Sequence, residues 1–150
     1  MCSKQKFFLC KVCGNMIGRL NDKGSGISCC GEPMSEIIAN TAEASTEKHL
    51  PVIDCEECCC GDDDCGCEDE ACSCGGGGCI RLCVSVGAAP HPMDESHRIM
   101  FVYVETERGG QRKCLCASET PKTCFCLNND KPIAVYAYCN LHGLWRTDCK

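Results

Sequence analysis

The sequence lacks several features that would place it in well-known classes of protein. Its 150 residues contain no run of 18 apolar residues, which argues against a membrane-spanning helix. The first residues, MCSKQKFFLCKVCGN, have neither the apolar core nor the small-residue cleavage site of a secretory signal, so we expect a cytoplasmic protein. Positive charge is also scarce, and the net charge of -6 argues against nucleic acid or an anionic membrane as the main partner.

Helical periodicity is a further absence, because no segment repeats its apolar residues convincingly every three to four positions. Apolar residues alternate instead in CIRLCVSVG (79–87), where Ile80, Leu82, Val84 and Val86 share one face. The segments HRIMFVYVET (97–106) and KPIAVYAYCN (131–140) are rich in β-branched and aromatic residues. We therefore predict an all-β protein whose larger domain, 47–150, is an immunoglobulin-like antiparallel β-sandwich.

The first 36 residues contain too few large apolar side chains to bury a core of their own, so this part needs a covalent or metal staple. Residues 37–46, IIANTAEAST, are mostly small and polar. The predicted organisation is a rubredoxin-type metal domain at 1–36, a linker at 37–46 and the sandwich at 47–150.

Cysteine is abundant, with 21 residues of this type. In a chain without a secretory signal such cysteines favour metal binding over disulfides. Cys10 and Cys13 form a CxxC turn, and Cys29 and Cys30 follow after a glycine-rich stretch. Four thiolates in so small a unit suit tetrahedral zinc or a mononuclear iron centre. Free cysteines or two disulfides are the alternative, and adjacent Cys29 and Cys30 would pair with each other only with difficulty.

Histidine is scarce, and all four histidines lie in three short motifs. A cysteine and a histidine three residues apart in VYAYCNLHGLW could equally be buried core residues if they stood alone. Together with the motifs EKHLP and HPMDESH they offer four imidazoles and one thiolate, a set that leaves one octahedral position open. The candidate ligands are His49, His91, His97, Cys139 and His142. Pro92 restricts the residue before it and so helps to fix His91.

These motifs carry a family resemblance. FLCKVCGNMI with GSGISCCGEPM resembles the desulforedoxin module, whose iron is held by four cysteinates. EKHLPVI, HPMDESHRI and AYCNLHGLW together resemble the desulfoferrodoxin form of superoxide reductase. The resemblance implies a catalytic ferrous site with four histidines and Cys139 as the axial ligand.

The same resemblance implies a reaction and partners. Superoxide would be reduced by one electron to hydrogen peroxide, and an external donor such as a rubredoxin would supply the electron to a homodimeric enzyme. Lys48 would attract superoxide, and Glu47 would occupy the open position of the oxidised iron. The four-cysteine centre would relay electrons or, as we favour, act as a structural staple. The rival hypothesis is a thiol-rich metal-storage or electron-carrier protein on a superoxide reductase scaffold.

Residues 55–78 form a cysteine-rich, acidic insertion that the family lacks. This segment has almost no bulky apolar residue, so it is either disordered or ordered by metal. If Leu115 and Phe125 face the core, alternation points the neighbouring cysteines outward. These thiols favour an additional metal or iron–sulfur cluster, with disulfides or incidental reduced thiols as alternatives. They are Cys83, Cys114, Cys116, Cys124 and Cys126.

Overall fold

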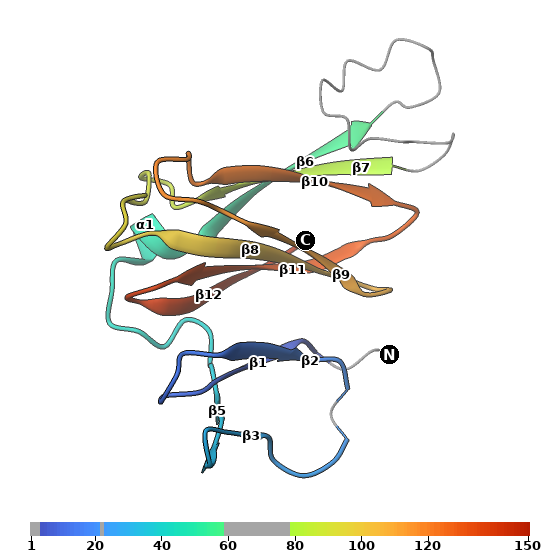
Figure 1. Ribbon diagram of the computed structural model, residues 1–150. Helices are drawn as coiled ribbons and strands as arrows, with labels where there is room; N and C mark the ends of the chain where they lie inside the picture. The colour runs from blue at the N-terminus through green and yellow to red at the C-terminus, as the bar shows by residue number, and fades with distance from the viewer. Residues whose placement is uncertain (1–3, 22, 59–78) are drawn as a thin grey trace.

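A computed structural model describes residues 4–21, 23–58 and 79–150, and its secondary structure is almost entirely antiparallel β (Figure 1). This confirms the predicted all-β class. A single helical turn, α1, spans Thr46–His49, which is too short to leave a periodic pattern in the sequence. The strands are β1 Lys6–Leu9, β2 Met16–Arg19, β3 Ser28–Cys29, β4 Glu32–Pro33, β5 Ser35–Glu36, β6 Pro51–Cys58, β7 Cys79–Val86, β8 Ile99–Thr106, β9 Gly110–Cys114, β10 Lys122–Asn128, β11 Pro132–Cys139 and β12 Gly143–Asp148.

Two sheets form the sandwich, with the strand orders β10-β7-β6 and β12-β11-β8-β9, and they lie as two layers in Figure 1. Their inner faces enclose one apolar core, to which both sheets contribute. The predicted alternation in β7 is confirmed, because Leu82, Val84 and Val86 are at most 1% exposed. Burial of such side chains supplies the main driving force for folding.

The N-terminal unit lies beneath the sandwich in Figure 1 and consists of the sheet β2-β1-β5 and the β3-β4 hairpin. Phe7 on β1 is 7% exposed and joins this unit to the sandwich. Its ring lies 6.0 Å from that of Phe101 and 5.5 Å from those of Tyr103 and Tyr136. An aromatic cluster therefore covers the outer face of β8 and β11.

The segment 37–46 is tied to β12. The Asn40 side chain donates from Nδ2 to the carbonyl of Arg146 and accepts the Arg146 N–H at Oδ1, at 3.0 and 2.8 Å. The Asn40 N–H donates to the carbonyl of Leu144 at 2.9 Å. Ile37 and Ala39 also pack against a buried cluster of the sandwich. This segment, which we predicted to be a linker, thus follows the sandwich surface before it enters α1.

The first four residues of the predicted insertion, 55–58, are part of a strand. Residues 55–58 belong to β6, which pairs with β7 over Pro51–Cys58. A ladder of backbone hydrogen bonds can hold such residues in a strand without bulky apolar side chains. Residues 59–78, where the rest of the predicted insertion falls, lie outside the described residues. In the described ranges, no helix has the length and apolar character required to cross a membrane.

Candidate metal centres

The four histidines and Cys139 converge at one end of the sandwich. One potential ligand atom from each of His49, His91, His97, Cys139 and His142 lies within 4.8 Å of all the others. His49 comes from α1, His91 and His97 come from the loop between β7 and β8, and Cys139 ends β11. Cys139 is fully buried, and His49 and His91 are 3% exposed each. Three of the five side chains are therefore shielded from water, whereas His97 and His142 are half-buried.

Hydrogen bonds on the far side of two rings aim their remaining nitrogens at the centre. Nδ1 of His49 lies 2.7 Å from the carbonyl of Ser45, and Nδ1 of His91 lies 2.6 Å from the carbonyl of Pro92. A carbonyl only accepts, so each Nδ1 carries the proton and each Nε2 keeps a lone pair. This is the arrangement that histidine ligands of metals usually show.

The inward nitrogens fit a metal. Within the described part of the chain, Nε2 of His91 and Nε2 of His97 are buried without a hydrogen-bond partner. His142 turns its Nδ1 inward, 3.6 Å from Sγ of Cys139 and 3.0 Å from Nε2 of His49. Buried nitrogens without partners are costly, and a cation at their common focus would satisfy them.

Burial favours the neutral form of His49 and His91. It lowers the pKa of His91 to about 4 and also lowers the pKa of His49. The neighbouring imidazoles add to this effect, because a second positive charge in the same cluster is unfavourable. Neutral imidazole is the form that binds a metal, so the fold presents His49 and His91 ready for coordination.

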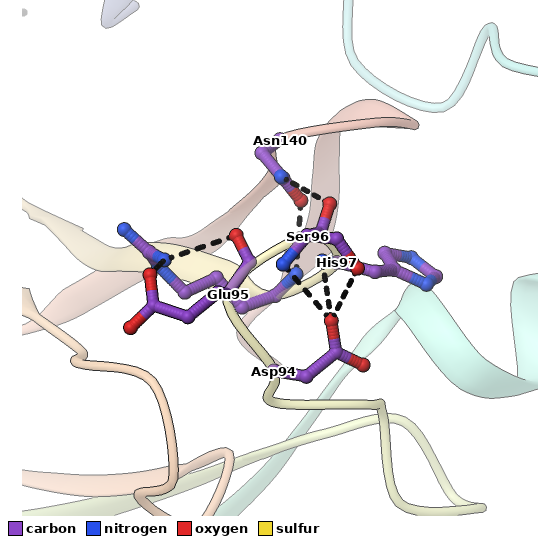
Figure 2. Close-up of polar contacts among 6 residues, drawn as sticks. Asp94, Glu95, Ser96, His97 and Asn140 are labelled. Carbon is purple, nitrogen blue, oxygen red and sulfur yellow. Dashed lines mark hydrogen bonds and ion pairs between the residues drawn. The ribbon is translucent and has the colours of Figure 1, made fainter.

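Asp94 shapes the loop that carries His97 (Figure 2). Its Oδ1 accepts hydrogen bonds from the Ser96 N–H at 3.0 Å, the Ser96 hydroxyl at 2.7 Å and the His97 N–H at 2.8 Å. These donors, led by the Ser96 side chain, lower the pKa of Asp94. The carboxylate therefore stays charged at neutral pH and fixes the backbone from which the His97 ring projects.

Asn140 connects this loop to the one that carries Cys139 and His142. Its Nδ2 donates to the carbonyl of Ser96 at 2.8 Å, and its Oδ1 accepts the Arg98 N–H at 2.9 Å (Figure 2). Its own N–H donates to the carbonyl of Arg98 at 3.2 Å. The two ligand-bearing loops are thereby held in register.

A tight turn supports α1 and the residues on it. Gly87 adopts φ +83°, and a Cβ built there would lie 2.5 Å from the carbonyl oxygen of Lys48. The N–H of Gly87 donates to the carbonyl of Leu50 at 3.0 Å, and the N–H of Ala88 donates to that of Glu47 at 2.8 Å. The side chains of Glu47 and Lys48 are exposed beside buried His49. Glycine is required here for both its conformation and its lack of a side chain.

Trp145 forms one wall beside His49. The two rings are stacked, with centroids 4.9 Å apart and an interplanar angle of 24°. Trp145 is 1% exposed and cannot move aside without disrupting the core. It therefore restricts the His49 ring from one face.

The second group lies in the N-terminal unit, where one sulfur from each of Cys10, Cys13, Cys29 and Cys30 lies within 4.8 Å of the others. A turn closed by the Gly14 N–H and the Cys10 carbonyl, 2.9 Å apart, shapes the CxxC segment. Backbone N–H donation from Cys13 lowers the pKa of Cys10 to about 7, whereas the adjoining thiols raise that of Cys30 to about 12. A bound cation would displace the thiol protons and hold all four sulfurs together as thiolates.

A groove of about 460 Å³ lies between the two groups. Leu9 and Lys11 from the CxxC side, Ile38 from the connecting segment and His142 from the histidine group contribute to its walls. Ile38 is 56% exposed, and Val12 and Leu141, which neighbour Lys11 and His142 in sequence, are 60% and 61% exposed. Apolar surface thus borders both candidate centres.

The prediction of an additional metal at the outward thiols is not supported. Leu115 and Phe125 do face the core. However, Cys83 and Cys124, directly opposite each other on β7 and β10, form a disulfide, which removes both sulfurs from metal ligation. Cys114 and Cys116 are exposed, and Cys126 is half-buried. Among the described residues, only the two groups above bring three or more metal-binding side chains together.

Comparison with known proteins agrees with the geometry. The desulfoferrodoxin family model matches residues 70–148. A desulfoferrodoxin of Syntrophotalea carbinolica is 32% identical over 148 residues, which cover 99% of both chains. A desulfoferrodoxin homolog of Methanothermobacter thermautotrophicus is 32% identical over 97% of this chain and 99% of its own. The superoxide reductase of Treponema pallidum superposes with a TM-score of 0.71 at 26% identity and covers 97% of this chain and 100% of its own.

Proposed function

The chain belongs to the desulfoferrodoxin family, and we propose on this basis that it is a superoxide reductase, an oxidoreductase that converts superoxide to hydrogen peroxide with an external electron donor. The observation that carries the proposal is the convergence of four imidazoles and one buried thiol on a single point. Nearly full-length similarity to a superoxide reductase structure supports it. The rival metal-storage function is not favoured, because the described residues offer two compact groups instead of a broad thiol surface.

The donor set fits iron. Imidazole nitrogen suits iron, and an anionic thiolate donates electron density to it. We propose that His49, His91 and His97 bind through Nε2, His142 binds through Nδ1, and Cys139 binds through its sulfur. Iron held by these residues would supply the single electron that superoxide takes up.

The chain's own contribution is to hold these donors and to attract the substrate. The stack of Trp145 on His49 and the carbonyl partners of the Nδ1 atoms keep the rings aimed without metal. On a chain of net charge -6, an anion is drawn in only where the field is locally positive. We assign that role to the exposed ammonium group of Lys48. We assign to the Glu47 carboxylate, on the same helical turn, the role of a further ligand that would bind the metal in its oxidised form.

The four-cysteine group is proposed as a second mononuclear iron site that staples the N-terminal unit of residues 1–36. That unit buries few side chains of its own, with Phe7, Cys10 and Met34 as its buried apolar residues among those described. The external donor is proposed to be a small electron-transfer protein such as a rubredoxin. The groove beside His142, with apolar Ile38 on its wall, supports its approach from that side. Homodimeric assembly and a cytoplasmic location stay predictions, and sedimentation tests the first.

Replacing the buried thiolate tests the function. We expect Cys139→Ser to abolish superoxide reduction in pulse radiolysis, because a serine hydroxyl is not a thiolate donor at neutral pH. The four-cysteine group should keep its iron, as measured by metal analysis with Mössbauer spectroscopy on anaerobically purified protein. Cys149→Ser, a cysteine outside both groups, is the matched control and should retain the parent rate. Turnover by the Cys139→Ser variant at the parent rate would refute the proposal.

A further inference from the structure

The Cys83–Cys124 disulfide lies on the outer face of the sheet β10-β7-β6. Both cysteines are half-buried, whereas their sequence neighbours Leu82, Val84 and Phe125 on the inner face are at most 1% exposed. On the other side of β7, exposed Asp54 of β6 lies opposite Cys83. The sulfurs therefore face outward and belong to no part of the core.

The fold does not depend on this covalent bond. Strands β7 and β10 pair over seven consecutive positions, from Ser85 opposite Lys122 to Cys79 opposite Asn128. Strand β6 pairs with the other edge of β7 over eight positions. The apolar inner face anchors the same strands to the opposite sheet. Cleavage of the S–S bond leaves all of these contacts in place.

The same pairing keeps the two thiols together after reduction. The Cα atoms are 4.0 Å apart, and opposite residues of an antiparallel ladder stay opposite as long as the ladder is formed. No chain movement is needed to bring one sulfur back to the other. The position thus supports both a dithiol and a disulfide within one folded structure.

We infer that Cys83 and Cys124 are a second redox site, which cycles between dithiol and disulfide and consumes hydrogen peroxide. One thiol gives up its proton, the thiolate attacks a peroxide oxygen, and the O–O bond breaks; the released hydroxide takes up that proton, so that a sulfenic acid and water are produced. The other thiol then displaces that hydroxyl group as a second water, and the S–S bond forms. Two electrons and two protons leave the dithiol, and one peroxide becomes two waters. An external dithiol restores the reduced pair by exchange.

The peroxide source links this site to the first one. This part of the inference rests on the proposed function, because superoxide reduction releases hydrogen peroxide from the same chain. The dithiol would then remove the product of the iron centre with electrons from a thiol reductant. The half-buried cysteines lie on the outer face of the sheet, where peroxide and a dithiol can approach them.

The test uses the full-length, iron-loaded protein under anaerobic conditions. Dithiothreitol first reduces the protein, which is then desalted, and hydrogen peroxide is added in substoichiometric amounts. Alkylation and peptide mass spectrometry follow Cys83 and Cys124, with Cys114 and Cys116 as exposed cysteines outside the disulfide. We expect one Cys83–Cys124 disulfide for each peroxide consumed, formed before Cys114 or Cys116 is oxidised. Far-UV circular dichroism and iron content should stay unchanged on reduction.

Two variants complete the design. In Cys83→Ser and in Cys124→Ser we expect complete loss of the disulfide and of the fast peroxide consumption, with the fold retained. Reduction that succeeds only in denaturant, or reduced pairs that peroxide oxidises no sooner than Cys114 and Cys116, would overturn the inference. Peroxide is added directly, so the oxidation experiment tests the Cys83–Cys124 pair whether or not the chain reduces superoxide. A failed superoxide assay would overturn only the proposed function and, with it, the iron centre as the source of the peroxide.

Discussion

Gly87→Ala should displace His49 and so disturb the histidine group, although Gly87 is not itself a candidate ligand. An alanine Cβ would lie 2.5 Å from the carbonyl oxygen of Lys48 and 2.4 Å from that of Ala89, whereas ordinary contact begins at 3.4 Å. Both obstacles are backbone, so no side chain can rotate away. The turn carrying Lys48 and His49 must move by roughly 0.9 Å, the difference between 3.4 and 2.5 Å, to accept the methyl group.

The energetic cost has two parts. A non-glycine residue at φ +83° costs about 1–2 kcal/mol, and overpacking adds about 1–3 kcal/mol. We therefore expect urea unfolding to show a loss of about 2–5 kcal/mol. A displacement of about 1 Å at a reacting group can reduce a rate by about 100-fold, so superoxide reduction should fall by about ten- to hundred-fold.

Gly31→Ala is the matched control, because its φ of +79° is nearly the same but nothing lies within 4 Å of the added Cβ. This variant should lose only the conformational part, about 1–2 kcal/mol, and should keep the parent rate at the histidine group. A Gly87→Ala variant with parent iron content and parent rate would show that α1 tolerates the shift. Equal losses of unfolding free energy in Gly87→Ala and Gly31→Ala would show that the steric clash at Gly87 does not contribute.

Three further perturbations test other parts of the structure. Lys48→Ile should slow the capture of superoxide and weaken the dependence of that rate on ionic strength, at unchanged iron content. An unaltered rate and salt dependence in stopped-flow experiments would show that Lys48 does not attract superoxide. Phe7→Ala should lower the free energy of unfolding in urea by about 3–5 kcal/mol, because the buried ring joins the N-terminal unit to the sandwich. Phe8→Ala, on the opposite and less buried face of β1, should cost clearly less. Equal losses would contradict the role of Phe7. In metal-free protein the pKa of His91 is about 4 in the folded state, against an ordinary value of 6.5. The unfolded state therefore binds the proton first, and the free energy of unfolding should fall as the pH drops from about 6.5 to about 4. His91→Gln should flatten this dependence on pH, and an unchanged dependence would contradict the assignment to His91.

The sequence was most informative where rare residue types were concentrated. Four histidines in three motifs left few ways to assemble a ligand set, and the structure does bring all of them to Cys139. Strand β7 was equally predictable, because alternation of apolar residues reports directly on the buried face of a strand.

The parts that escaped prediction depend on contacts between distant segments. Asp94 and Asn140 are common polar residues, and only the fold shows that they bind the loops carrying the ligands. Gly87 could be recognised as a turn residue but not as one pressed against Lys48. The Cys83–Cys124 bond required the register of β7 against β10, which spacing in the sequence does not determine.

The Asn140 bridge has a consequence for how the histidine group can change. Because one amide side chain contacts the backbone on both sides of His97, a shift of the Cys139–His142 loop carries the His97 loop with it. The four ligands that these two loops carry, His91, His97, Cys139 and His142, therefore move together and not independently. Replacement of a single ligand should leave its position empty without moving the loops that carry the others. An added small molecule such as imidazole should then be able to bind at that position.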